Sequence, residues 1–219
     1  MPIVPIVLVT AVRSPKERVA AVKTEEVFQM AEKRAVVVDE RKEGLGIQDL
    51  ILIAILIAAG AVLKLTVSSF LSFAGMKPNF MIAMYCIAII LTRPNLAQSL
   101  VVGLLVGLVS QIPLLNATPM VNFASEAIGA VVCCLLCMVF SKVASNNHAA
   151  QNIAFPAVIT FISTVFSGYT FAMIVGVTVS GLEPLAVFGV YAVMVLGTAV
   201  MNCIVAAILV PVLRNVLKK

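Results

Sequence analysis

Polar and ionisable side chains are rare in the apolar part of this sequence, so each of them is a candidate for chemistry. After Asp49 the acidic residues are Glu126 and Glu183 alone. Such groups are costly at membrane depth and usually face a cavity or a partner. The candidates are Lys64, Lys77, Tyr85, Asn116, Asn122, Glu126, Tyr169, Thr170, Glu183 and Asn202. Together they indicate a small-molecule cavity that opens toward the exterior.

Each candidate also has a structural explanation that the sequence leaves open. Asn202 could bond a neighbouring backbone group, and Glu126 could act as an interfacial acid near the start of its own helix. Lys77 could anchor a helix at the membrane interface. Position in the sequence alone does not separate these explanations from ligand binding.

The sequence holds no arrangement of residues that is typical of a catalyst or a metal site. It lacks a Gly-rich phosphate loop ending in Gly-Lys-Ser/Thr, and His148 is its one histidine. Cys133-Cys134-x-x-Cys137 superficially resembles a metal motif, but a zinc site needs further sulfur or imidazole ligands. We therefore expect these cysteines to pack within a membrane helix, and we predict no enzymatic activity, no cofactor and no metal. Uphill transport would need an ion gradient or an energy-supplying partner.

The composition requires lipid as the main solvent. Hydrophobic residues make up 62% of the 219 residues and charged residues 11%, against about 25% charged in soluble domains. The net charge of +5 does not indicate nucleic-acid binding, because the excess of Lys and Arg lies at predicted helix ends. The predicted fold class is therefore an all-α integral membrane protein.

Six apolar stretches predict six membrane-spanning helices in residues 49–219. A helix needs about 20 apolar residues to cross a bilayer. The predicted spans are residues 50–67, 79–91, 96–112, 127–140, 153–179 and 185–213. The second is short, which suggests tilting or shielding by protein.

The N-terminal segment, residues 1–48, has a different composition from the rest. It holds eight Lys or Arg residues and seven Asp or Glu residues, so we expect a polar cytosolic extension. Ser14-Pro15-Lys16-Glu17 has the pattern of a helix start. This pattern predicts a short helix that ends near Lys33 or Arg34, with a poorly ordered tail as the alternative.

The distribution of basic residues predicts the orientation in the membrane. With the N-terminal segment in the cytoplasm, five basic residues of the membrane domain face the cytoplasm and two approach the exterior. The five are Arg93, Lys142, Arg214, Lys218 and Lys219, and the two are Lys64 and Lys77. This asymmetry satisfies the positive-inside rule, so both termini are predicted to be cytoplasmic.

Small residues recur at four-residue spacing in two of the predicted spans. Ala54-x-x-x-Ala58 lies in the first and Gly103-x-x-x-Gly107 in the third. This spacing places both small groups on one helix face, where another helix can approach closely. The approaching helix could belong to this chain or to a partner protein.

From about Ile47 to the C-terminus the sequence resembles the tryptophan-transport (TrpP-like) family. The resemblance rests on Gly75-Met76-Lys77-Pro78, on residues 58–63 and 163–168, and on Asn202 nine residues before Pro211. It implies a six-helix substrate-binding S component of an energy-coupling-factor transporter in a bacterial plasma membrane. The implied partners are a membrane coupling subunit, docked at Ala54 and Ala58, and two ATPase subunits.

The implied ligand, tryptophan, sets the roles of the candidate residues. An amino-acid zwitterion needs a fixed cation for its carboxylate and acceptors for its ammonium group. Lys77 is the first choice for the carboxylate, with Lys64 as its substitute. Glu126 and Asn122 are the expected partners of the ammonium group.

The indole would be held by apolar and aromatic walls with one polar partner for its N–H. Tyr169 and Asn202 are the expected contributors. Asn79 also lies near the expected pocket, at a position where the family more often has Asp, and residues 122–126 differ from the family in ending with an acid. The alternatives are another aromatic or vitamin-like solute and, as a different class, a homo-oligomeric channel.

Overall fold

The computed structural model describes residues 44–70, 78–112, 115, 118–142 and 150–217. The chain divides after Gly44 into two units, residues 1–44 and 45–219, and apart from Gly44 every described residue belongs to the second. The helix predicted to start at Ser14 lies outside the described residues, as do Lys77 and Asn116.

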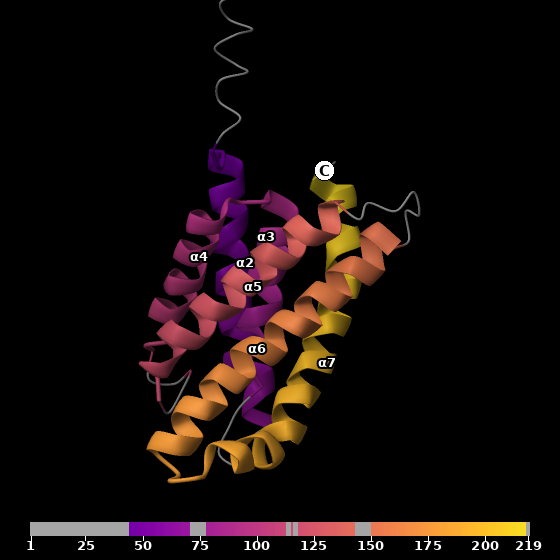
Figure 1. The fold of residues 1–219 in the computed structure, drawn as a ribbon. Helices are drawn as coiled ribbons and strands as arrows, with labels where there is room; N and C mark the ends of the chain where they lie inside the picture. Colours follow the sequence, from indigo (N-terminus) through magenta and orange to yellow (C-terminus); the bar gives the residue numbers. More distant parts are fainter. Residues whose placement is uncertain (1–43, 71–77, 113–114, 116–117, 143–149, 218–219) are drawn as a thin grey trace, which may run out of the picture. The chain divides into compact units, whose positions relative to one another are not determined.

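The described residues fold into helices and contain no strand. The helices are α2 (Ile47–Phe70), α3 (Met81–Thr92), α4 (Leu96–Val109), α5 (Val121–Lys142), the short π-helix η2 (Ala150–Ala154), α6 (Phe155–Thr178) and α7 (Pro184–Leu217). Figure 1 shows the chain running up and down the bundle, with α6 lying alongside α5 and α7.

Four of these helices are long and apolar enough to cross a membrane: residues 47–67, 121–141, 151–178 and 184–217. The other two, α3 and α4, have 12 and 14 residues, fewer than the roughly 20 that a bilayer requires. The prediction of an all-α protein is therefore confirmed for the described residues, and four of the six predicted spans are helices of membrane length. That all six cross the membrane stays a prediction.

Helix α3 forms the centre of the bundle, which explains how so short a helix can be apolar along its whole length. Every residue from Met81 to Leu91 is buried, and α3 contacts α2, α4, α5, α6 and α7. Since other helices enclose it, α3 does not have to match the bilayer thickness. Of the two explanations that the sequence left open for this short segment, tilting and shielding, the structure supports shielding by protein.

Helix α4 begins with a reciprocal cap and packs closely against α5. The side chain of Asn95 accepts from the Gln98 N–H at 2.8 Å, and the Gln98 side chain accepts from the Asn95 N–H at 3.0 Å. At Gly103 an added Cβ would lie 2.7 Å from the Glu126 carbonyl oxygen, and at Gly107 it would lie 2.9 Å from the Phe123 ring. Both glycines therefore allow close approach of α5.

Helix α5 begins earlier than the apolar pattern predicts. The apolar run starts at residue 127, whereas the helix starts at Val121. Asn122 and Glu126 therefore lie inside α5 and not in the connection before it. They interrupt the apolar run because they face the interior of the bundle, where both are buried.

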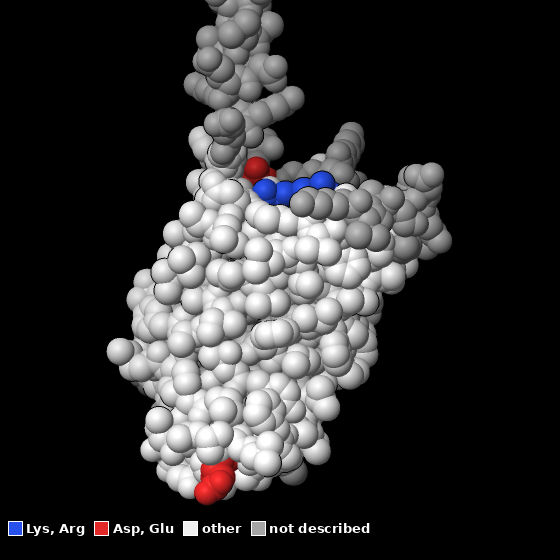
Figure 2. All heavy atoms as spheres, in the orientation of Figure 1, with Lys and Arg blue, Asp and Glu red and all other residues white. Residues whose placement is uncertain are grey.

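The two ends of the bundle differ in charge. The basic end is the end at which α2 and α6 begin and α3, α5 and α7 finish, and it carries Arg93 and Arg214. At the opposite end the turn between α6 and α7 carries the exposed Glu183. Figure 2 shows Lys and Arg gathered at the first end, with acidic atoms beside them, and only acidic atoms at the second end of this face.

Candidate functional site

A cluster of polar side chains lies inside the bundle, between α2, α3, α5, α6 and α7. The polar cluster consists of Lys64, Asn79, Tyr85, Asn122, Glu126, Thr164, Ser167 and Asn202. All except Asn79 are buried, and the exposed fraction is 2% for Lys64 and 0% for Glu126. A polar group in such an environment needs a partner, since an unsatisfied one costs about 1–3 kcal/mol.

Asn79, just before α3, connects α5 and α7 through hydrogen bonds. Its side-chain amide donates to one carboxylate oxygen of Glu126. Its backbone carbonyl accepts from the Asn202 side-chain amide at 3.0 Å. The same Asn202 nitrogen also lies 3.2 Å from the hydroxyl of Thr164 on α6, whose own proton goes to the Thr160 carbonyl oxygen at 2.7 Å.

Lys64 and Glu126 give the polar cluster one basic and one acidic side chain. The ammonium group of Lys64 is close enough to the Glu126 carboxylate for the two charges to attract each other. Removing a charged group from water costs several kcal/mol, on the order of what a buried opposite charge recovers. A charge on either group therefore offsets part of the cost of burying the other.

Several polar atoms of the cluster make no hydrogen bond with the described residues. They are Asn79 Oδ1, Glu126 Oε2, Asn202 Oδ1, Asn122 Nδ2 and the Tyr85 hydroxyl. Three of these atoms are acceptors, one is a donor, and a hydroxyl can be either. Buried polar groups are nearly always paired in folded proteins, so this group of atoms is the feature that points to a polar ligand.

The Tyr85 hydroxyl reaches the cluster through space that Gly129 leaves open. An added Cβ at Gly129 would lie 2.1 Å from this hydroxyl and 2.9 Å from the Ser167 Cβ. The hydroxyl lies beside Glu126 and Ser167, without a hydrogen bond of ordinary geometry to any described residue. Gly129 is one helical turn after Glu126 on α5, so the same helix supplies the acid and the space beside it.

The structure brings most of the sequence-predicted binding residues together. Lys64, Asn79, Asn122, Glu126 and Asn202 all belong to the polar cluster. These residues come from helices that are far apart in the sequence, and their spacing in the chain gave no indication of which pairs meet.

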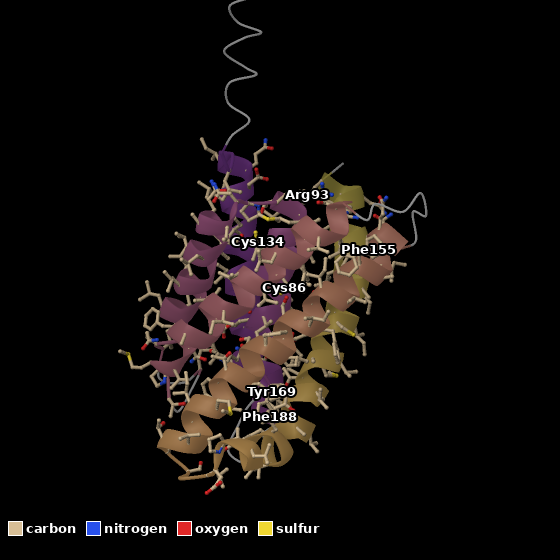
Figure 3. All side chains as sticks on the ribbon, viewed as in Figure 1. Cys86, Arg93, Cys134, Phe155, Tyr169 and Phe188 are labelled. Carbon is tan, nitrogen blue, oxygen red and sulfur yellow. The ribbon has the colours of Figure 1, made fainter. Side chains whose placement is uncertain are left out.

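Tyr169 occupies a different place. Its ring packs on Phe188 of α7 with the centroids 5.0 Å apart, and its hydroxyl donates to the Phe188 carbonyl oxygen at 3.4 Å. Figure 3 shows this pair toward the end of the bundle opposite Arg93 and Phe155. Both rings line an open apolar groove that also includes Phe166 and Met173.

Sequence reasoning counted Tyr85 among the polar candidates for a cavity without giving it a specific role, and it did not select Thr164 or Ser167 as binding residues. Tyr85 is enclosed in an apolar run, so the only available signal was its polar hydroxyl at membrane depth. Thr164 and Ser167 belong to a segment rich in small hydroxyl residues on α6, and their spacing of three places both on one helix face.

The small-residue motifs occupy two different environments. Ala54 and Ala58 lie on an exposed face of α2, together with Ile51, Ile55 and Val62. Gly103 and Gly107 are buried against α5. Packing within the chain, one of the two explanations that the spacing left open, accounts for the glycines.

Comparison with known proteins places the chain in a family. A model of the tryptophan transporter TrpP family matches residues 46–218. The chain belongs to this family. A probable tryptophan transport protein of Bacillus subtilis (strain 168) is 29% identical over 177 residues, which cover 78% of this chain and 94% of that protein. No solved structure matches the chain.

Membership of the TrpP family confirms the resemblance seen in the sequence. The family is one of transporters, so the chain is a membrane transport protein and not an enzyme. The matched region begins at residue 46, next to the boundary between the two units of the structure. It contains the whole polar cluster and every described helix.

Proposed function

We propose that this protein is the substrate-binding membrane subunit, or S component, of an energy-coupling-factor transporter that takes up tryptophan. Membership of the TrpP family supports tryptophan transport. The observation that carries the binding role is the polar cluster, in which a buried lysine, a buried glutamate and several unpaired polar atoms lie inside an otherwise apolar bundle. The proposed architecture has six crossings, with the short α3 and α4 embedded among longer helices.

A zwitterion is the ligand whose charges match this cluster. We assign the carboxylate of tryptophan to the Lys64 ammonium group, with the Asn122 side-chain amide as a second donor. The ammonium group has three N–H donors, and Asn79 Oδ1, Glu126 Oε2 and Asn202 Oδ1 are three acceptors without partners among the described residues. Binding then exchanges the attraction between Lys64 and Glu126 for two charge-assisted contacts with the ligand.

The remaining sequence-predicted residue for the carboxylate is Lys77, which lies outside the described residues. A contact between Lys77 and the carboxylate stays a proposal that rests on the family resemblance alone. Lys64 has the stronger support, because its charge acts on Glu126 inside the bundle. Tyr85 is the aromatic side chain of the cluster, and we assign it a contact with the indole.

The energy for uptake is proposed to come from partner subunits. No phosphate-binding loop is present in the sequence, so ATP hydrolysis must occur on other chains. We propose that the exposed face of α2 around Ala54 and Ala58 contacts a membrane coupling subunit that carries two ATPase subunits. Small side chains allow a partner helix to approach closely.

The cellular setting follows from the charge distribution. We propose a multi-pass protein of the bacterial plasma membrane, with both termini and the basic end of the bundle in the cytoplasm. The polar N-terminal segment, residues 1–48, is then a cytosolic extension before the membrane domain. The polar cluster is reached from the exterior.

Binding of tryptophan to the purified protein tests the proposal directly. The protein contains no Trp, so the fluorescence of added tryptophan is the only indole signal. We expect a saturable blue shift as the indole enters an apolar site. Tryptamine lacks the carboxylate and indole-3-propionate lacks the amine, so each should compete at least about tenfold more weakly than tryptophan, the cost of one charge-assisted contact.

Two outcomes would redirect the proposal. If another aromatic or vitamin-like solute binds while tryptophan does not, the architecture stands and the substrate changes. If the protein co-purifies from its native membrane only with copies of itself and never with ATPase subunits, a homo-oligomeric channel becomes the better description.

A further inference from the structure

A second polar feature lies at the basic end of the bundle, far from the polar cluster along the helices. It is a cavity of about 480 Å³ between the end of α3, the end of α5, the start of α6 and the end of α7. Arg93 and Arg214 line it, together with the apolar side chains of Ile90, Phe140 and Phe155. None of the described residues that line it is acidic.

The two arginine side chains are near each other in this cavity. Arg93 is exposed and Arg214 is half-buried, and both line this cavity together with Cys137. Arg214 is held in place, since one guanidinium nitrogen donates to the Gln151 carbonyl oxygen at 3.0 Å and to Asn152 Oδ1 at 2.6 Å. These partners are neutral, so they orient the charge without cancelling it.

The backbone at Arg93 favours another residue type. Its φ angle is +47°, and it is the one non-glycine residue of the described chain with a positive φ. It ends α3 in the left-handed conformation, donating its N–H to the Ile89 carbonyl oxygen at 2.9 Å. Glycine or asparagine is usual at such a position, so the arginine side chain is present despite the backbone and not because of it.

The cavity combines a cationic rim with an aromatic wall. The rings of Phe140 and Phe155 contact each other with centroids 4.9 Å apart, and both face the cavity. Guanidinium groups bind phosphate oxygens through paired N–H donors. A phosphate ion alone would leave the aromatic wall in water, whereas a phospholipid covers the rim with its phosphate and the wall with its glycerol and upper acyl chains.

We propose that this cavity binds the phosphate group of an acidic phospholipid through Arg93 and Arg214. The ligand comes from the leaflet at the basic end of the bundle, the cytoplasmic leaflet in the proposed orientation, where acidic lipids attract basic side chains. The cavity is formed by the ends of α3, α5, α6 and α7, so a lipid bound there bridges four helices. Its expected effect is to stabilise the bundle at this end.

The test compares thermal unfolding of the purified protein in nanodiscs of phosphatidylcholine with and without phosphatidylglycerol. For the wild type we expect the unfolding temperature to rise with phosphatidylglycerol and to saturate. Arg93→Gly suits the left-handed backbone and so should fold, but it should lose the response. Arg93→Lys keeps the charge and loses the paired donors, so its apparent affinity should fall about tenfold. Tryptophan binding should be unchanged in both variants, which separates this proposal from the substrate site.

Three results would overturn the proposal. The first is an equal response of the wild type and Arg93→Gly to phosphatidylglycerol, which would indicate general surface attraction. The second is full retention of the response by Arg93→Lys. The third is the same stabilisation by millimolar inorganic phosphate in phosphatidylcholine alone, which would assign the cavity to a soluble phosphate.

Discussion

The side-chain amide of Asn79 donates a hydrogen bond to the carboxylate of Glu126, two residues that are 47 positions apart in the chain. The contact joins the segment before α3 to the second turn of α5, inside the bundle. Of these two residues only Glu126 is an acid. Asn79 occupies one of the two oxygens of its carboxylate. The other oxygen, Oε2, has no hydrogen-bond partner among the described residues and is the atom that we assign to the ligand.

Exchanging the amide at residue 79 with the acid at residue 126 should preserve the hydrogen bond between the two side chains. Glu126→Gln removes the only acid, and Asn79→Asp places a second carboxylate against the first. Each single variant should weaken tryptophan binding at least about tenfold, the scale of a charge-assisted contact. The double variant, Asn79→Asp with Glu126→Gln, again has one acid and one amide and should recover much of the binding. Titration of tryptophan fluorescence measures all four proteins.

This double-mutant cycle has an internal control for folding. Thermal unfolding in detergent shows whether a variant has lost binding through loss of structure. Additive losses in the double variant, with unchanged unfolding temperature, would mean that the two side chains do not act as a unit.

The same contact shows why sequence reasoning reached the site only in part. Asn79 in place of the family's usual Asp and the acid at residue 126 looked like two separate departures from the family pattern. In the structure the two positions are in direct contact, because Asn79 donates a hydrogen bond to Glu126. A single sequence contains no measure of which distant residues touch, so this link needed the fold.

Helix positions were predictable for a different reason than the site. Apolar runs near bilayer length predict membrane helices directly, and each predicted span corresponds to a helix. The start of α5 was placed too late because Asn122 and Glu126 interrupt the apolar pattern while facing inward. The sequence also left open which way Gly103 and Tyr169 face. Spacing and depth in the membrane do not tell whether a residue faces the ligand, another helix or lipid.

Replacing Lys64 should discriminate between ligands with and without a carboxylate. Lys64→Met keeps the length of the side chain and removes its charge. We expect tryptophan binding to weaken at least about tenfold, while binding of tryptamine changes little. Competition titrations with both ligands measure the difference. An equal loss for both would show that Lys64 supports the fold of the site and does not hold the carboxylate.

Adding one methyl group at Gly129 should destabilise the protein and weaken binding. In Gly129→Ala the new Cβ would meet the Tyr85 hydroxyl at 2.1 Å, and overpacking of this kind costs about 1–3 kcal/mol. The variant should unfold at a lower temperature and bind tryptophan more weakly. Gly189→Ala is the matched control, because nothing lies within 4 Å of a Cβ added there.

A second variant identifies the cause of the damage. Tyr85→Phe removes the hydroxyl that the new methyl group would strike, so adding it to Gly129→Ala should restore part of the stability. If Gly129→Ala behaves like Gly189→Ala, the Tyr85 side chain does not occupy the space beside Glu126.

The proposed orientation can be tested by labelling single cysteines from outside the cell. In a background without the five native cysteines, Met120→Cys and Glu183→Cys should react with an impermeant maleimide, since both lie at the end of the bundle opposite Arg93. Ala97→Cys, an exposed position at the basic end, should react only after the membrane is made permeable. The reverse pattern would place the basic end outside and contradict the positive-inside assignment.

Bulky substitutions on the exposed face of α2 should separate transport from binding. Ala54 and Ala58 are exposed, and their side chains make no part of the polar cluster. In Ala54→Leu and Ala58→Leu, tryptophan binding should stay within about twofold of the wild type, because the change adds no contact inside the bundle.

Uptake by cells that express the coupling and ATPase subunits should be nearly abolished in both variants, because a partner helix could no longer approach closely. Ala186→Leu is the matched control, an exposed alanine on α7 and not on α2, and its uptake should be largely retained. Equal losses of binding and uptake at Ala54 and Ala58, or unchanged uptake in both variants, would remove the support for a docking face on α2.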